Sequence, residues 1–77
     1  MKDRIRDLRK SLRMTQQEFA AKIGASRNSI ASYETGARVP LDSVLTLIAR
    51  TFNVNETWLR TGEGAMFNEV TRDERVA

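Results

Sequence analysis

The pattern of apolar and polar positions along the chain predicts helices. Ile5, Leu8 and Leu12 stand at i, i+3 and i+7, which places them on one face of a helix over about residues 2–12. No alternation of apolar and polar residues is long enough to indicate a strand. The expected fold class is therefore all-α.

Two closely spaced helices are predicted next, over residues 16–23 and 27–35. Residues 15–18 read Thr-Gln-Gln-Glu, a capping box that begins the first of them. Gly24 supplies the left-handed backbone conformation that ends a helix, and Ser26 is a good N-cap for the next one. A helix, a three-residue turn and a second helix form the arrangement that inserts one helix into a groove of DNA.

Two more helices complete the predicted domain. One covers about residues 41–52, and a short one follows that Asn55 can cap. We expect a five-helix domain over residues 1–64 and a C-terminal tail over residues 65–77. The apolar residues that these two helices bury are expected to be Val44, Leu45, Ile48, Ala49, Phe52, Trp58 and Leu59.

The tail holds one unusual feature. Residues 71–74 read Thr-Arg-Asp-Glu, another capping box, and only three residues follow it. A helix start with almost no helix after it suggests that the natural protein continues into an oligomerisation or sensor region. The alternative is a frayed terminus.

The predicted helix over residues 27–35 has two distinct faces. At 100° per residue, an inward Ile30 turns Tyr33 and Glu34 inward as well. In the major groove, arginine pairs bidentately with guanine and asparagine with adenine. The outer face is short, polar and nearly free of acids, and it comprises Arg27, Asn28, Ser29 and Ser32.

Charge and composition narrow the function further. The net charge of +3 combines +5 over residues 1–50 with −2 over residues 51–77, so the basic part suits a polyanionic partner. The chain has neither cysteine nor histidine, which removes the usual general base and the usual zinc ligands. It lacks a phosphate-binding glycine loop and an apolar run long enough for a membrane span. We therefore expect a cytoplasmic protein that is no enzyme, needs no metal or cofactor and makes no membrane contact.

These residues together resemble a known family, the phage repressor and Cro-type (XRE-type) helix-turn-helix domains. The resemblance implies a five-helix, lambda-repressor-like fold, double-stranded DNA as partner and a homodimer on a palindromic site. It also implies transcriptional regulation, most often repression of phage or mobile-element genes. It covers about residues 4–64 and rests on residues 15–24, Ser26, Ile30, Tyr33, Glu34, Gly36, Pro40 and residues 58–64.

The resemblance also assigns roles to individual residues. Arg9 matches a basic residue that contacts phosphate and pairs with the glutamate at Glu34, and the inward position of that acid independently requires a partner. Arg13 departs from the family, which often has glycine there, so the turn can differ or gain a phosphate contact. The expected base-reading residues are Arg27, Asn28 and Ser32. The expected phosphate-contacting or bracing residues are Arg9, Gln16, Gln17, Ser26, Ser29 and Arg38.

Two questions stay open at this stage. Trp58, Met66 and Phe67 are either a lid on the core or a contact with a second copy of the chain. The main partner is either DNA or, as in an antitoxin or another interaction module, a second protein. An enzyme is the third alternative, which the missing catalytic side chains disfavour.

Overall fold

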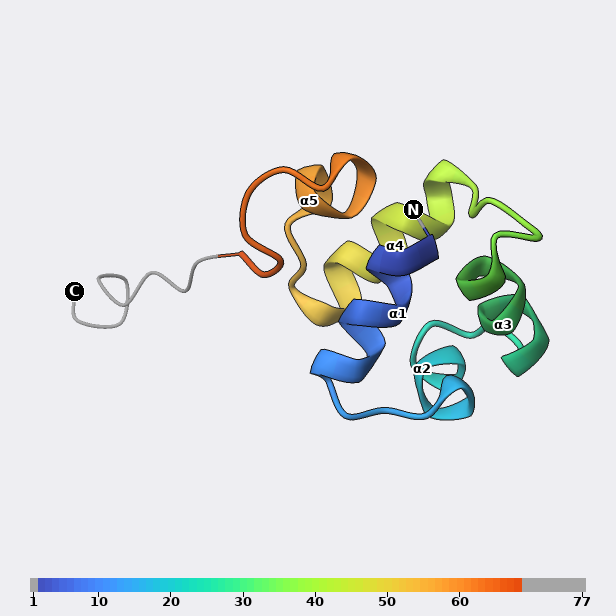
Figure 1. Cartoon of the computed structure of the whole chain (residues 1–77). Coiled ribbons are helices and arrows are strands. Elements are labelled where there is room, and N and C mark those ends of the chain that lie inside the picture. The colour runs from blue at the N-terminus through green and yellow to red at the C-terminus, as the bar shows by residue number, and fades with distance from the viewer. Residues whose placement is uncertain (1, 69–77) are drawn as a thin grey trace.

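The computed structural model describes residues 2–68, which form five helices joined by short turns (Figure 1). The tail residues 69–77, including the capping box expected at residues 71–74, lie outside the described part. The helices are α1 (Lys2–Ser11), α2 (Gln16–Lys22), α3 (Arg27–Thr35), α4 (Asp42–Phe52) and α5 (Glu56–Thr61). The predicted all-α class is confirmed, and the helix boundaries differ from the predicted ones by one residue at most.

The helix ends follow the local signals in the sequence. The Thr15 hydroxyl accepts from the Glu18 amide at 3.1 Å, and the Glu18 carboxylate accepts from the Thr15 amide at 2.8 Å. The capping box therefore satisfies two free donors at the start of α2. Helix α4 begins one residue later than predicted, because Leu41 has an extended backbone and acts as its N-cap.

One hydrophobic core joins all five helices. Helix α2 packs against α3, α3 also packs against α1, and α4 packs against α5. The rings of Phe19 and Phe52 stack with their centroids 4.8 Å apart and so connect α2 to α4. The hydrophobic side chains that form this core are Ile5, Leu8, Phe19, Ala20, Ile23, Ile30, Tyr33, Leu45, Ile48, Ala49, Val54 and Leu59.

The segment after α5 stays attached to the domain. The Asn55 amide donates to the Met66 carbonyl at 2.9 Å, and the Asn68 amide donates to the Asn53 carbonyl at 3.0 Å. Val54 and Phe67 form an isolated antiparallel bridge. These contacts hold residues 66–68 against the loop between α4 and α5.

Candidate nucleic-acid interface

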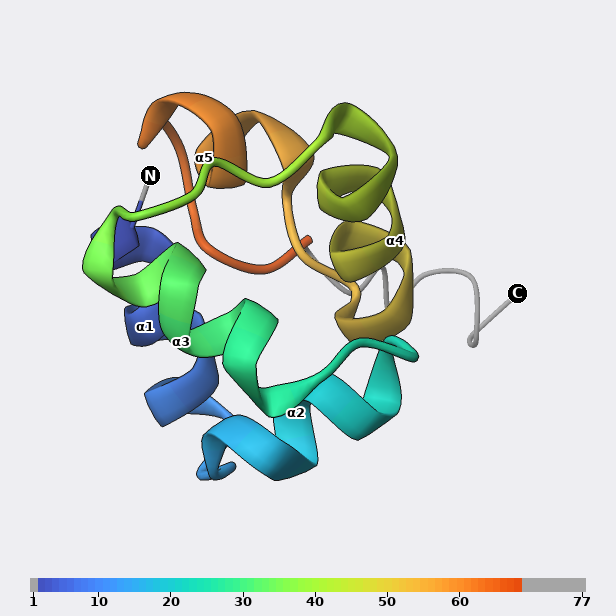
Figure 2. The same ribbon diagram turned by 90° about the vertical axis from the view of Figure 1, so that its right-hand side faces the viewer.

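The turn between α2 and α3 sets the angle between these two helices. Gly24 has a φ of +70°, and it donates to the Ala21 carbonyl while the Ala25 amide donates to the Ala20 carbonyl. This pair of bonds is a Schellman motif, which ends a helix and reverses the chain sharply. Ser26 then begins α3, since its hydroxyl accepts from the Ser29 amide at 3.1 Å. Figure 2 shows α3 across the front of the molecule, with α2 below its first turn.

Helix α3 divides into the two faces that the sequence predicts. Ile30, Tyr33 and Glu34 are buried. Arg27 and Asn28 are exposed at the first turn of the helix. Ser29 and Ser32 are half-buried, so the outer face is widest at its N-terminal end.

The buried acid of α3 is held by an arginine of α1. Arg9 donates from Nε to Glu34 Oε2 at 2.6 Å and from Nη2 to Glu34 Oε1 at 3.0 Å. The same guanidinium donates from Nη1 to the Met14 carbonyl at 2.9 Å. A bidentate, charge-assisted pair of this kind fixes both side chains in one orientation. It therefore joins α1, the turn after α1 and the C-terminal half of α3.

Two further donors complete this network. Gln16 Nε2 donates to Glu34 Oε1 at 3.2 Å, which joins the first residue of α2 to α3. Arg6 donates from Nη2 to the Glu34 carbonyl at 3.1 Å. The Gln16 amide group has a second hydrogen, so it can still donate to a phosphate oxygen. Arg9 uses three of its five N–H donors inside the protein.

Burial and hydrogen bonding act against each other on these charges. Burial by itself raises the pKa of Glu34. Hydrogen bonds from Arg9 and Gln16, together with the charges of Arg9 and Arg6, lower this pKa by more than burial raises it. The net pKa of Glu34 lies below its ordinary value. The hydrogen bond with Glu34 raises the pKa of Arg9. The pair is therefore fully ionised near neutral pH.

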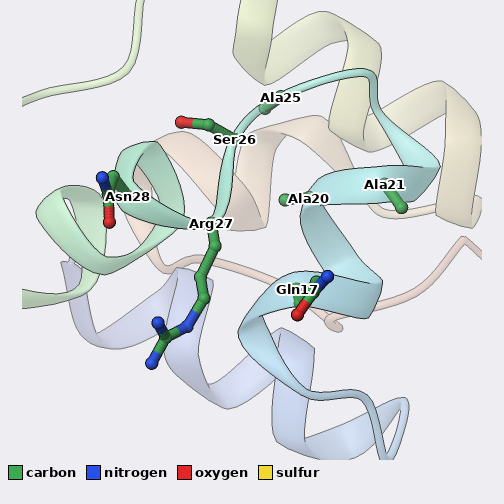
Figure 3. Close-up of a pocket in the computed structure, with 7 residues that line it drawn as sticks. All are labelled: Gln17, Ala20, Ala21, Ala25, Ser26, Arg27 and Asn28. Carbon is green, nitrogen blue, oxygen red and sulfur yellow. The ribbon is translucent and has the colours of Figure 1, made fainter.

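An open hollow lies where α2 meets the start of α3 (Figure 3). Its small side chains come from α2 and the turn, whereas Arg27 extends from the start of α3 alongside α2. Gln17 projects from α2 near the same hollow. The hollow provides concave space beside the exposed polar side chains of α3. It is lined by Gln17, Ala20, Ala21, Ala25, Ser26, Arg27 and Asn28.

The loop after α3 carries the last expected phosphate-contacting residue. The Arg38 amide donates to the Ser32 carbonyl at 3.2 Å, so the loop returns toward α3. The guanidinium of Arg38 lies 5.7 Å from the centre of the Tyr33 ring, within the range of a cation–π contact. Arg38 is exposed and lies near the C-terminal end of α3. Arg27 and Arg38 are thus cations at opposite ends of the outer face.

Arg13 adopts an unusual backbone conformation. Its φ is +58°, in the left-handed region that favours glycine. The turn after α1 therefore keeps the conformation that a glycine adopts readily, and the arginine side chain remains exposed.

The expected dimer contacts and the exposed apolar side chains lie in different places. Trp58, Met66 and Phe67 are half-buried and pack against the core of their own chain. Among residues 2–68, the large apolar side chains that are exposed are instead Val39, Leu41 and Leu47. The sequence places Leu41 inside a predicted helix, so its position as an exposed N-cap could not be foreseen.

Residues 2–68 contain no cluster of three acidic, histidine or cysteine side chains suited to a metal ion. None of the described helices has the length and apolar character that crossing a membrane requires.

Comparison with known proteins agrees with this geometry. The family model for Helix-turn-helix matches residues 5–59. An HTH-type transcriptional regulator of Archaeoglobus fulgidus is 42% identical over 53 residues, which cover 69% of this chain and 76% of that protein. No solved structure gives a significant match.

Two longer bacterial proteins are also similar. The antitoxin PezA of Streptococcus pneumoniae is 39% identical over 66 residues, or 86% of this chain and 41% of that protein. The HTH-type transcriptional regulator YobD of Bacillus subtilis is 32% identical over 56 residues, or 73% of this chain and 50% of that protein. The chain thus spans about half the length of these two relatives or less. With a family model that covers most of its folded part, the chain belongs to the XRE-type helix-turn-helix family.

Proposed function

We propose that the chain binds double-stranded DNA sequence-specifically and acts as a transcriptional regulator. One observation carries this proposal: the outer face at the start of α3 is exposed and polar, while the buried Glu34 fastens the inner face to α1 and α2. A rigidly held helix with a polar outer face is what major-groove recognition requires. The match to the helix-turn-helix family supports the same function.

Recognition of bases rests on the first turn of α3. Arg27 has the donor geometry for the O6 and N7 atoms of guanine, and Asn28 matches the N6 and N7 atoms of adenine. Ser32 lies one turn further along and is half-buried, so it contacts a base only where the helix approaches closely. We assign direct base readout to these three residues.

Phosphate contacts position the helix in the groove. Ser26 and Ser29 lie at the N-terminus of α3 and Gln17 near that of α2, where free backbone amides attract phosphate oxygens. Gln16 donates a second amide hydrogen outward, and Arg38 approaches the backbone beyond α3. Arg9 acts mainly through Glu34, because three of its five N–H donors are used within the protein and its side chain is largely buried.

The protein is expected to work as a homodimer in the cytoplasm. A two-fold symmetric pair of domains places one α3 in each half of a palindromic site, about one helical turn of DNA apart. Occupation of such a site beside a promoter blocks transcription. Repression of phage or mobile-element genes is the role that the family resemblance favours.

Substitutions at Asn28 and Arg38 test the proposed division of labour. Asn28→Ala should weaken binding to the preferred site by about 1–3 kcal/mol and relax the preference at one base pair. Arg38→Ala should weaken binding similarly on all sequences and reduce the salt dependence by about one phosphate contact. Fluorescence anisotropy over a salt series measures both. Equal losses on all sequences for Asn28→Ala would contradict a base-reading role.

A second candidate function is that of an antitoxin, which the similarity to PezA favours. An antitoxin binds and neutralises a partner protein, and its DNA-binding domain can still regulate transcription. Co-expression with the product of a neighbouring gene distinguishes the two. If the neighbouring gene product inhibits growth and co-expression of this protein restores it, the antitoxin function is supported. If growth is restored only when the operator of that gene is intact, the protein acts as a regulator alone.

A further inference from the structure

We propose that Tyr33 is a positioning residue for DNA binding, because its ring holds the guanidinium of Arg38 ready to contact a phosphate. The guanidinium carbon of Arg38 lies 5.7 Å from the centre of the Tyr33 ring. This distance is within the range of a cation–π contact. The inference rests on the proposed DNA-binding function, and it concerns a buried side chain that acts through another residue.

The ring of Tyr33 is a fixed platform on α3. Tyr33 is 6% exposed and belongs to the hydrophobic core. The next residue of the helix is Glu34, whose carboxylate accepts hydrogen bonds from Arg9 and Gln16. These contacts fasten this part of α3 to α1 and α2. A group that stacks on the ring therefore takes its position from α3.

The short chain segment between the ring and the guanidinium is held by hydrogen bonds. Gly36 has a φ of +85°, which turns the chain back at the end of α3. The Thr35 hydroxyl donates to the Ser32 carbonyl at 3.2 Å and accepts from the Ala37 amide at 3.4 Å. The Arg38 amide donates to the same carbonyl at 3.2 Å. The backbone of Arg38 is therefore fastened to the last turns of α3, and the ring holds its side chain as well.

Stacking leaves the hydrogen-bond donors of Arg38 available. A guanidinium is planar, and its five N–H groups point outward in that plane. The ring covers one face, so the edge is free for the oxygens of a phosphate. Arg38 is exposed, and within residues 2–68 no carboxylate forms an ion pair with it. The guanidinium can thus stay on the ring while it contacts DNA.

The stacking lowers the cost of ordering Arg38 on DNA. A free arginine side chain loses rotamer freedom when it contacts a phosphate, and this loss weakens binding. On the Tyr33 ring, part of that freedom is already lost in the free protein. The benefit is equal on all DNA sequences, since a phosphate contact itself carries no sequence information.

A double-mutant cycle with Tyr33→Leu and Arg38→Ala tests the coupling between the two side chains. Leucine is apolar but has no ring face, so Tyr33→Leu should weaken binding to a duplex selected from random DNA about two- to fivefold. Tyr33→Phe keeps the ring face and is the matched control, which should bind almost as well as the wild-type protein. In the Arg38→Ala background, Tyr33→Leu should have no further effect, because the cation is already absent. Fluorescence anisotropy measures each affinity.

The salt dependence of binding separates loss of the charge from loss of its position. Arg38→Ala should reduce the slope of log affinity against log salt by about one, since one phosphate contact is lost. Tyr33→Leu keeps the arginine, so its slope should stay close to that of the wild-type protein while its affinity falls. Thermal unfolding followed by circular dichroism checks that Tyr33→Leu is folded at the assay temperature.

Nuclear magnetic resonance tests the contact in the unsubstituted protein, independently of how Tyr33→Leu folds. Tyr33 is the single tyrosine of the chain, so its ring protons are easily identified. We expect nuclear Overhauser effects between these protons and the side chain of Arg38, both in the free protein and in its complex with the selected duplex. Their absence in the complex would overturn the proposal.

Three binding results would also overturn it. These are an equal loss of affinity for Tyr33→Leu and Tyr33→Phe, an undiminished loss for Tyr33→Leu in the Arg38→Ala background, or tighter binding by Tyr33→Leu. The last result would mean that the ring withholds Arg38 from DNA. Failure of the wild-type protein to enrich any duplex would instead contradict the proposed function itself.

Discussion

The substitution Glu34→Gln is the sharpest test of how α3 is held. The Glu34 side chain is 4% exposed and the Arg9 side chain 15%, and their two hydrogen bonds are 2.6 and 3.0 Å long. Glutamine has nearly the same shape but carries no charge. It also presents an NH2 group where one carboxylate oxygen accepted. The change therefore leaves the Arg9 charge partly buried without its counterion.

The expected loss follows from this geometry. Removal of one partner from a buried ion pair costs about 3–5 kcal/mol. We expect the lower end, about 3 kcal/mol, because Arg9 keeps its bond to the Met14 carbonyl and some access to water. A chain of this length has a total free energy of unfolding of roughly 4–12 kcal/mol. The melting temperature should therefore fall by roughly 12–24 °C.

Thermal and urea unfolding followed by circular dichroism measure this loss. The matched control is Glu56→Gln, which removes the exposed i,i+4 pair between Glu56 and Arg60 and should have little effect. A double-mutant cycle with Arg9→Met isolates the coupling between Arg9 and Glu34, expected to be about 2 kcal/mol or more. A loss below about 1 kcal/mol for Glu34→Gln, or no coupling in the cycle, would refute the reasoning.

Three other predictions concern stability. Arg13→Gly should stabilise the fold by about 1 kcal/mol, because φ is +58° at this position, and a lower melting temperature would contradict the strain. Thr15→Ala should cost about 1 kcal/mol in urea unfolding through loss of the capping box, and no change would exclude its role. The lowered pKa of Glu34 gives a contribution that is complete above about pH 5 and is lost as the pH falls through the ordinary value of about 4.3 and then the folded value. The free energy of unfolding should therefore fall less between pH 7 and pH 3 in Glu34→Gln than in the wild-type protein. An equal fall in both proteins would contradict this assignment.

Local sequence signals were sufficient to predict the helices. The capping box at Thr15, the glycine at Gly24 and the N-cap at Ser26 each act over three or four residues, and the structure has each of them. The inward position of Glu34 followed from the helical period. A buried acid needs a partner, and the family resemblance identified Arg9 as that partner, which the structure confirms.

Features that depend on packing between distant segments were harder to predict. The attachment of Met66 and Phe67 depends on backbone contacts with residues 54–55, which no local pattern reports. The exposure of Leu41 depends on whether α4 begins at residue 41 or at residue 42, and helix boundaries are uncertain by a residue or two. The second donor to Glu34, Gln16, is also a tertiary contact, although the resemblance had assigned Gln16 a bracing role.

Selection of preferred sites from random duplex DNA tests the central claim most directly. The account predicts enrichment of one palindromic motif, with half-sites about one helical turn apart and a guanine or adenine at the positions facing Arg27 and Asn28. The same selection with Asn28→Ala should lose the preference at one position in each half-site. Recovery of a random pool, or of an identical motif from the wild-type protein and Asn28→Ala, would contradict base readout by the start of α3.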